Sequence, residues 1–373
     1  MVAIKGERIV TIKDICALFD IGGKYIGCEE IVSGNINCTY RVRFVRDGEK
    51  KSYILQRINK TVFKEPEKVM DNIVRVTQHI RMNIVNEKLS TKTGVLRAFY
   101  SREDDEPYII DDRGDYWRCY RYIPNSITYD TCDDLTIIRR AGKAFGKFQN
   151  YLKDFPAKTL FITIPDFHDT KKRYKAFHDA IKENPLNRVN KVKEEIDALL
   201  SFEDDACILQ NYLDSGKIPY RVTHNDTKCN NVSFDKDTGE ALAVLDLDTV
   251  MPGAIAHDFG DAIRFIANTV IEDYPHVEDV ALDIDKFEAF TKGFVCEIKD
   301  SITDLEKQTL NLGVFTMTVE LAVRFLTDYI LGDGYFKTKY PGHNVDRAKN
   351  QIALATDIKG KRKEIDEIVK KYL

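Results

Sequence analysis

Three oxygen-bearing side chains stand at the spacing that phosphoryl transfer from a nucleotide requires. Asp226 lies within the stretch HNDTKCNN and precedes Asn231 by five residues, and Asp246 follows at the end of a later apolar run. In phosphoryl-transfer enzymes an aspartate in the first position orients the attacking hydroxyl, while an asparagine and a later aspartate hold magnesium. The spacing therefore predicts Asp226 as the base and Asn231 and Asp246 as metal ligands.

The residues between the two predicted ligands indicate a β-hairpin. Residues 232–235 and 241–245 are strand-like, and a cluster of turn residues at 237–240 separates them. With the turn centred symmetrically, Asn231 is expected to lie opposite Asp246, so that both oxygen ligands reach one end of the hairpin. Magnesium prefers such carboxylate and amide oxygens together with phosphate. The alternative is a hairpin whose flanking polar residues are ordinary turn residues.

Three neighbours of these residues are further candidates. Lys228 is predicted to neutralise charge on the transferring phosphoryl group, the alternative being an exposed lysine without a role. His224 is predicted to brace the loop through hydrogen bonds rather than to exchange protons. Asp248 either binds a second metal ion or simply continues the strand.

Past the hairpin, the string HDFGDAIRF predicts the start of a helix. Asp258 and Asp261 fall in its first turns, where the helix dipole favours carboxylates, and we expect them to brace the catalytic loop. Arg264 can pair with one of them across a helical turn. The Asp-Phe-Gly within this string comes 12 residues after Asp246 and is not the metal motif of protein kinases.

The strings HNDTKCNN, DLDTVMPG and HDFGDAIRF together resemble the aminoglycoside phosphotransferase and choline kinase superfamily, and within it the N-acetylhexosamine 1-kinases. The resemblance spans most of the chain, from a strand pair near residue 31 to residues 335–336. It implies a bilobal, protein-kinase-like α+β fold that uses ATP and magnesium between its lobes. A small antiparallel-sheet N-lobe, residues 1–123, would bind the nucleotide. A larger, mainly helical C-lobe, residues 124–373, would carry catalysis and substrate binding.

For the N-lobe the resemblance implies a set of nucleotide contacts. The polar loop after residue 32 would cover the nucleotide, although it holds one glycine and an ordinary hairpin turn is the alternative. Arg57 stands near the strand position where protein kinases place a phosphate-binding lysine, the alternative being a solvated arginine. Asp71, preferred over Glu67, is its expected carboxylate partner, and residues 121–123 are expected to line the adenine pocket. The predicted contacts are Ser33, Asn35, Asn37, Arg57, Asp71, Arg121, Tyr122 and Ile123.

For the C-lobe the resemblance implies that His168, Arg324 and Tyr335 lie near the sugar. The segment around His168 can instead be the solvated basic start of a helix. Arg324 lies on an otherwise apolar helix and needs a partner, which a sugar hydroxyl or an acetamido oxygen supplies. A structural ion pair with Glu320 or Asp328 is the alternative.

Composition excludes several other classes of protein. The chain has 373 residues, 31% of them charged, and a net charge of −4, whereas nucleic-acid binders carry a basic excess. Its eight cysteines include no CxxC pair, so a reducing, cytoplasmic setting is expected. Residues 313–331 are apolar but hold three charged residues, which predicts a buried helix rather than a membrane span. We expect a monomer or weak homodimer that binds neither nucleic acid nor membrane.

Helical periodicity begins at residue 135, behind a cap at Asp133 or Asp134. Gly142 and Gly146 in this helix are one turn apart and predict close helix packing.

Together these patterns favour transfer of the γ-phosphoryl group of ATP to the anomeric hydroxyl of an N-acetylhexosamine. One alternative is a kinase of another small alcohol on the same fold, such as choline, an aminoglycoside or another sugar. The other is a pseudokinase that binds nucleotide without turnover, which the presence of Asp226, Asn231 and Asp246 disfavours.

Overall fold

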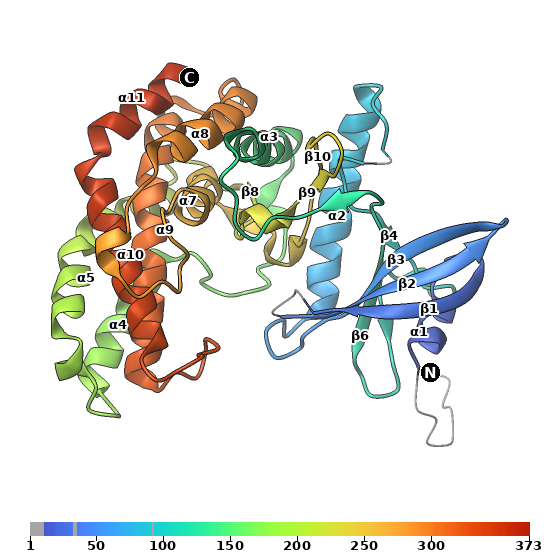
Figure 1. Ribbon diagram of the computed structural model, residues 1–373, viewed down its shortest axis with the longest axis horizontal. Coiled ribbons are helices and arrows are strands. Elements are labelled where there is room, and N and C mark those ends of the chain that lie inside the picture. The colour runs from blue at the N-terminus through green and yellow to red at the C-terminus, as the bar shows by residue number, and fades with distance from the viewer. Residues whose placement is uncertain (1–10, 33–35, 92) are drawn as a thin grey trace. The chain divides into compact units, whose positions relative to one another are not determined.

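The computed structural model describes residues 11–32, 36–91 and 93–373, and the chain divides into two compact units (Figure 1). The first unit is Met1–Asn125 and the second is Ser126–Leu373. Each unit is described by itself below.

The first unit is built on an antiparallel sheet with strand order β1-β2-β3-β6-β4, and β5 also pairs with β6. Two helices, α1 and α2, accompany the sheet (Figure 1). The bounds are α1 Ile12–Leu18, β1 Lys24–Ile31, β2 Cys38–Arg46, β3 Glu49–Arg57, α2 Pro66–Asn86, β4 Ala98–Phe99, β5 Ile109–Ile110 and β6 Tyr116–Arg121.

Alternation along the strands sends side chains to two different cores. Leu55 and Cys119 lie opposite each other in the sheet and are fully buried in a cluster that includes Phe19, just after α1. The residues on either side of Cys119 point to the other face, where Arg118 and Tyr120 both contact Met70 of α2. One face of the sheet therefore packs against α1 and the other against α2.

The second unit is mainly helical. Its helices are α3 Leu135–Tyr151, α4 Thr170–Glu183, α5 Lys193–Ala206, α6 Ile208–Asp214, α7 Ile255–Ile266, α8 Ile284–Ile298, α9 Asp304–Leu331, α10 His343–Gly360 and α11 Arg362–Tyr372. Its strands are β7 Ser126–Ile127, β8 Arg221–Thr223, β9 Val232–Asp235, β10 Ala241–Val244 and β11 Met251–Gly253. The antiparallel sheet followed by a helical region confirms the predicted α+β class. Asp134 caps α3 by accepting from Thr136 N at 2.7 Å, as predicted.

Helix α9 is the central helix of the second unit and packs against α4, α5, α7 and α10 (Figure 1). It is long and apolar enough to cross a membrane by length and composition alone, but 83% of its apolar window is buried inside the protein. A core helix of a soluble protein passes the same test, and the predicted buried helix at 313–331 is confirmed. Its polar residues Glu320 and Asp328 are also buried.

Glycines allow two helix pairs to touch through their backbones. A Cβ on Gly142 would stand 2.3 Å from the Phe290 carbonyl oxygen, so α3 and α8 pack closely, as predicted. Where α7 crosses α9, a Cβ on Gly260 would stand 2.2 Å from the Gly313 oxygen. A Cβ on Gly313 would stand 2.0 Å from the Ala256 oxygen. Backbone cannot yield as a flexible side chain does, so these glycines set the distance between α7 and α9.

We predict that Gly313→Ala lowers the free energy of unfolding by about 1–3 kcal/mol, because the added methyl group forces α7 and α9 apart. Alanine is the better helix former, so a substitution without a steric clash would raise the free energy of unfolding instead of lowering it. Gly360→Ala is the matched control, because its Cβ meets nothing within 4 Å. Urea unfolding of both variants decides the point. Equal stability of the two variants would show that the α7–α9 contact is not tight.

Candidate active site

The loop that carries Asp226 follows strand β8 directly and leads through a short 3-10 helix, Cys229–Asn231, into β9. Asn225 adopts the left-handed conformation with φ of 65°. This conformation is uncommon for a residue other than glycine and persists only where the surroundings hold it.

Two carboxylates of α7 hold the amide groups of this loop. Asp258 accepts from the backbone N–H groups of His224 and Asn225, each at 2.8 Å, and from the Gln149 side chain at 2.6 Å. Asp261 accepts from Thr227 N at 2.8 Å. The predicted bracing of the loop by Asp258 and Asp261 is confirmed. Burial raises the pKa of Asp258, and the donors around it oppose that rise by stabilising the charged form.

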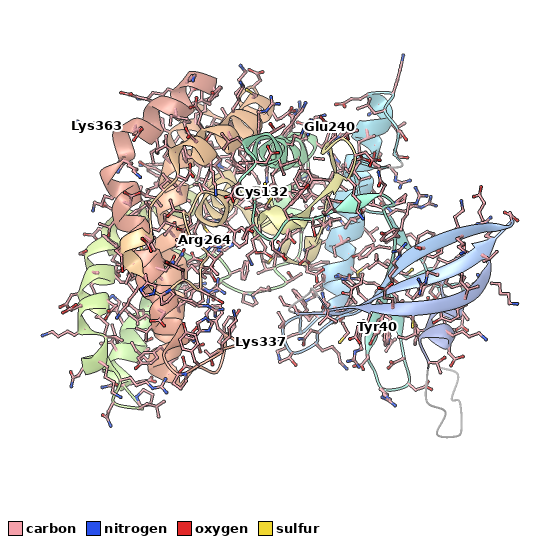
Figure 2. The ribbon with its side chains drawn as sticks, in the orientation of Figure 1. Tyr40, Cys132, Glu240, Arg264, Lys337 and Lys363 are labelled. Carbon is pink, nitrogen blue, oxygen red and sulfur yellow. The ribbon has the colours of Figure 1, made fainter. Side chains whose placement is uncertain are left out.

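Arg264 balances the charge of Asp261. Its guanidinium lies 2.9 Å from Asp261 and 2.7 Å from Glu272, and it is buried inside the second unit (Figure 2). The predicted pairing across one helical turn is confirmed. Removing this cation would leave a buried carboxylate unpaired and would strongly lower the stability of the fold.

His224 braces the loop from inside. Its Nε2 lies 2.8 Å from the Leu245 carbonyl oxygen, and its Nδ1 accepts from the backbone N–H of Asp226 at 3.3 Å. A carbonyl accepts and an amide donates, so the ring carries its proton on Nε2. Both nitrogens are engaged, which agrees with the predicted bracing role rather than proton exchange.

The Asp226 carboxylate meets two donors. Lys228 Nζ lies 2.9 Å from Oδ1, and the Asn231 amide donates to Oδ2 at 3.2 Å. Burial raises the pKa of Asp226, but Lys228 and its other partners outweigh burial and leave the pKa below its usual range. Asp226 in turn raises the pKa of Lys228 to about 12. The side chain of Asp226 is still 29% exposed, so an ionised carboxylate can accept a hydrogen bond from a hydroxyl group.

The hairpin register differs from the prediction by one residue. Val244 lies opposite Val232, and Leu245 N donates to the Asn231 carbonyl at 2.8 Å, so Leu245 rather than Asp246 faces Asn231. The turn is centred one residue earlier than predicted, because Asp235 N donates to the Glu240 carbonyl at 2.8 Å. An irregularity between Ala241 and Ala243 then adds a residue to β10 and reduces the difference to one.

The predicted metal ligands still follow this end of the hairpin. Asp246 adopts φ of 52° at the start of a 3-10 helix, Leu247–Thr249, so Asp248 does not continue the strand and is buried. Among the described residues no group of three or more His, Cys, Asp or Glu side chains could hold a metal. Magnesium at a nucleotide needs only one or two protein carboxylates besides phosphate oxygens. The oxygens of Asn231, Asp246 and Asp248 fit that requirement, and their role as ligands remains a prediction.

Arg324 lies among aromatic rings. Its guanidinium carbon is 5.4 Å from the ring centre of Phe167 and 5.5 Å from that of Phe336, and it donates to the Tyr335 hydroxyl at 3.4 Å. In the described part of the chain no carboxylate forms an ion pair with it, so the alternative pairing with Glu320 or Asp328 does not occur. Arg324 and Tyr335, predicted together near the sugar, therefore contact each other.

His168 contacts two protein acceptors that the sequence did not predict. Its two ring nitrogens lie 2.8 Å from Glu320 Oε1 and 3.1 Å from the Asn225 carbonyl oxygen. Neither nitrogen is left to contact a substrate, because both already meet protein acceptors. The sequence signal for this contact is Glu320 itself, because an acid on an apolar helix needs a partner. From the sequence, Glu320 is named only as a possible partner of Arg324.

In the first unit, one predicted pairing is corrected. Arg57 forms its ion pair with Asp115, at 3.2 Å, from the turn before β6. Asp71 instead pairs with Arg75 one turn along α2, also at 3.2 Å. The partner of Arg57 depends on the strand pairing of β3 with β6, which brings Trp117 opposite Arg57 and the preceding turn beside it.

The other predicted nucleotide contacts have local partners or fall outside the described residues. Asn37 accepts from the backbone N–H of Asn59 at 3.0 Å. Arg121 lies opposite Tyr53 in the sheet. Its pKa is lowered mainly by burial and also by the charges of nearby arginines. Tyr122 lies under the Arg41 guanidinium at 4.2 Å, and Ile123 follows it. Ser33 and Asn35 lie outside the described residues.

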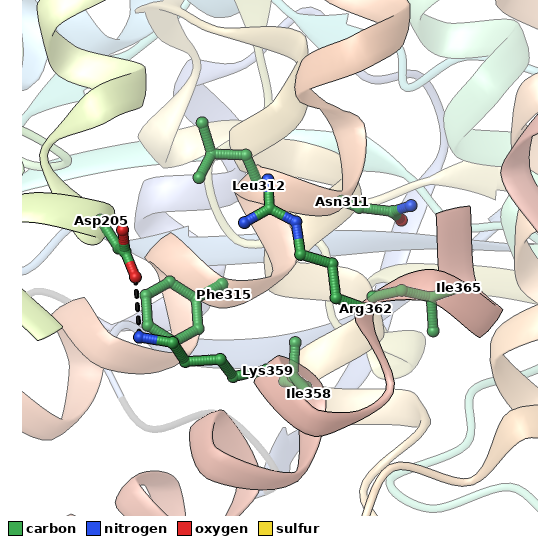
Figure 3. A pocket seen from close by; sticks show the side chains of 8 residues that line it. All are labelled: Asp205, Asn311, Leu312, Phe315, Ile358, Lys359, Arg362 and Ile365. Carbon is green, nitrogen blue, oxygen red and sulfur yellow. Dashed lines mark hydrogen bonds and ion pairs between the residues drawn. The ribbon is translucent and has the colours of Figure 1, made fainter. Parts of the chain in front are cut away.

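A small pocket elsewhere in the second unit contains none of these residues (Figure 3). Lys359 and Asp205 form an ion pair of 2.8 Å at one side of it, beside the ring of Phe315. The pocket is therefore distinct from the loop around Asp226.

The braced aspartate, its lysine and the asparagine that follows are the arrangement that the sequence predicts for a phosphotransferase. Residues 27–289 match the phosphotransferase enzyme family, and the chain belongs to this family.

Solved structures agree with the fold. An aminopropanol kinase associated with a microcompartment is 13% identical, with a TM-score of 0.58 over 95% of this chain and 97% of that chain. A spectinomycin phosphotransferase in complex with ADP and spectinomycin is 13% identical, with a TM-score of 0.54 over 93% and 98%. A choline kinase from Cryptosporidium parvum is 14% identical, with a TM-score of 0.52 over 95% and 94%. The predicted kinase-like fold is confirmed.

We predict that Asp258→Asn lowers the free energy of unfolding by about 1–3 kcal/mol and also lowers turnover, because at least one loop N–H loses its acceptor. Asp285→Asn, on the exposed surface of α8, is the matched control. Thermal unfolding and ADP release measure the two effects. Full activity of a correctly folded Asp258→Asn variant would contradict the bracing role.

Proposed function

We propose that this phosphotransferase moves the γ-phosphoryl group of ATP to the anomeric hydroxyl of an N-acetylhexosamine and gives the sugar 1-phosphate. The observation that carries the reaction is the Asp226 carboxylate held between Lys228 and Asn231. Residues 1–123 would bind the nucleotide, and residues 124–373 would supply the catalytic and acceptor-binding groups. Asn37, Arg57, Arg121, Tyr122 and Ile123 remain predicted nucleotide contacts.

In this mechanism Asp226 accepts a hydrogen bond from the sugar hydroxyl and aligns its oxygen with the γ-phosphorus. A new oxygen–phosphorus bond forms while the bond to the β-phosphate oxygen breaks and ADP leaves. The hydroxyl proton passes to Asp226 late in the transfer. Lys228 offsets negative charge beside the reacting group.

Asn231, Asp246 and Asp248 would hold magnesium. When bound, the ion would neutralise negative charge on the phosphate oxygens. The Asn231 amide N–H group already contacts Asp226, so this residue would link the base to the metal site.

The surroundings of Arg324 support a neutral, oxygen-rich acceptor. Aromatic rings are the groups that commonly hold a quaternary ammonium ion. Here the rings of Phe167, Tyr335 and Phe336 surround an arginine of the chain itself, whose charge would repel choline or an aminoglycoside. Guanidinium donors suit hydroxyl and acetamido oxygens. Another sugar or small neutral alcohol is the second candidate.

The test is phosphorus NMR of products formed from ATP, magnesium and a panel of acceptors. The panel contains N-acetylglucosamine, N-acetylgalactosamine, glucosamine, choline and an aminoglycoside. We expect a new sugar 1-phosphate signal with the N-acetylated sugars. Phosphorylation of choline or the aminoglycoside alone would contradict the proposed acceptor.

In the same assay, Asp226→Asn is expected to lower turnover by at least about 100-fold, the usual contribution of a general base. Asp237→Asn, at the exposed tip of the hairpin, is the control. A near-normal rate of the correctly folded Asp226→Asn variant would refute the mechanism.

A further inference from the structure

His168 joins helix α9 to the catalytic loop. It precedes α4, and its side chain is only 8% exposed. Its Nδ1 lies 2.8 Å from Glu320 Oε1, and its Nε2 lies 3.1 Å from the carbonyl oxygen of Asn225. A carboxylate and a carbonyl are both acceptors, and a neutral imidazole has only one N–H to donate.

We propose that Glu320 holds His168 as an imidazolium and that this charged pair positions Asp226 for phosphoryl transfer. His168 and Glu320 are positioning residues, because they act through the Asn225 carbonyl and not on substrate. This inference rests on the proposed role of Asp226.

The carbonyl that His168 holds belongs to the peptide unit that enters Asp226. The N–H of the same peptide unit donates to His224 Nδ1 at 3.3 Å. Because a peptide unit is planar, fixing its oxygen and its nitrogen from two sides fixes the orientation of the chain at Asp226. His168 and His224 thus hold opposite edges of one peptide plane.

The remaining polar groups of Asn225 have separate anchors. Its backbone N–H donates to Asp258 at 2.8 Å, and its side-chain amide donates to the Thr249 carbonyl at 2.8 Å. These contacts keep Asn225 in its left-handed conformation, but neither fixes the plane of the following peptide. The contact of His168 with the Asn225 carbonyl fixes that plane.

The charged groups around Glu320 favour its ionised form. Glu320 is buried and also accepts from Thr170 at 2.9 Å. Burial raises the pKa of Glu320, but His168, then Arg324 of α9 and Arg173 of α4, outweigh burial and lower it to about 2. His257 of α7 lies with its ring centre 5.4 Å from that of His168. Burial and then His168 lower the pKa of His257 to about 3, so His257 adds no charge near neutral pH.

The pair also lies beside the proposed acceptor site. Glu320 and Arg324 are one turn apart on α9, and Phe167, next to His168, has its ring 5.4 Å from the Arg324 guanidinium. Within the second unit, contacts therefore run without a break from Arg324 to Asp226. They pass through Phe167, His168 and Asn225.

Nitrogen-15 NMR of histidine-labelled protein tests the charge directly, with His168→Gln to assign the signal. In the wild-type protein at pH 8 we expect both ring nitrogens of His168 to carry protons. In Glu320→Gln only Nε2 should, because the side-chain amide of the variant can donate to Nδ1 while Nε2–H still donates to the Asn225 carbonyl. A neutral His168 in the wild-type protein at pH 8 would overturn the proposal.

ADP release from ATP tests the positioning role, because it reports transfer both to N-acetylglucosamine and to water. For His168→Phe, which removes the N–H group that holds the Asn225 carbonyl, we expect a kcat at least about tenfold lower, since a shift of about 1 Å at a reacting group can cost about 100-fold. The KM for ATP should not change. Glu320→Gln should lose less activity than His168→Phe, because a neutral ring with its proton on Nε2 still donates to that carbonyl.

Glu364→Gln, on the exposed side of α11, is the matched control and should behave as wild type. If His168→Phe does not fold, His168→Ala replaces it and should show the same kcat loss. A loss of stability with unchanged kcat per folded molecule would overturn the proposal. If N-acetylglucosamine fails to stimulate ADP release, the proposed acceptor is refuted, while the NMR result and the slow transfer to water still decide the role of the pair.

Discussion

The contact between the Asp258 carboxylate and the backbone amides of His224 and Asn225 is the constraint on which the site depends. The loop has no strand partner at this point, and Asn225 adopts a left-handed conformation that needs external support. A buried carboxylate that accepts several N–H groups gives a strong, directional anchor, because charge-assisted hydrogen bonds are stronger than neutral ones. The cost of burying this charge is offset by its three donors.

Helix packing puts that carboxylate in place. Gly260 of α7 and Gly313 of α9 bring the two helix backbones into direct contact. Helix α7 then supplies acceptors to the amide groups of the loop, through Asp258 and Asp261. Helix α9 reaches a carbonyl of the same loop through Glu320 and His168. The small residues that let the helices touch therefore determine where Asp226 stands.

Local patterns were sufficient to predict a phosphotransferase and the first braces of the loop, whereas contacts between residues distant in sequence were not predicted. The spacing of Asp226 and Asn231, the hairpin, and the carboxylates at the start of α7 all lie within about 40 residues of chain. The hairpin register was wrong by one because the turn is centred between Asp237 and Thr238, one residue earlier than predicted, and the extra residue in β10 offsets only part of that difference. The partner of Arg57 was wrong because Asp115 is 58 residues away and is brought near only by strand pairing. The contact of His168 with Glu320 spans 152 residues, and the local pattern shows only that an acid on an apolar helix needs a partner.

The most direct measurement is a crystal structure of the protein with ADP, magnesium, aluminium fluoride and N-acetylglucosamine. Aluminium fluoride takes the place of the transferring phosphoryl group. The account predicts that the anomeric hydroxyl donates to the Asp226 carboxylate and points at the aluminium. An anomeric hydroxyl that contacts another residue, with Asp226 turned away from it, would contradict the account.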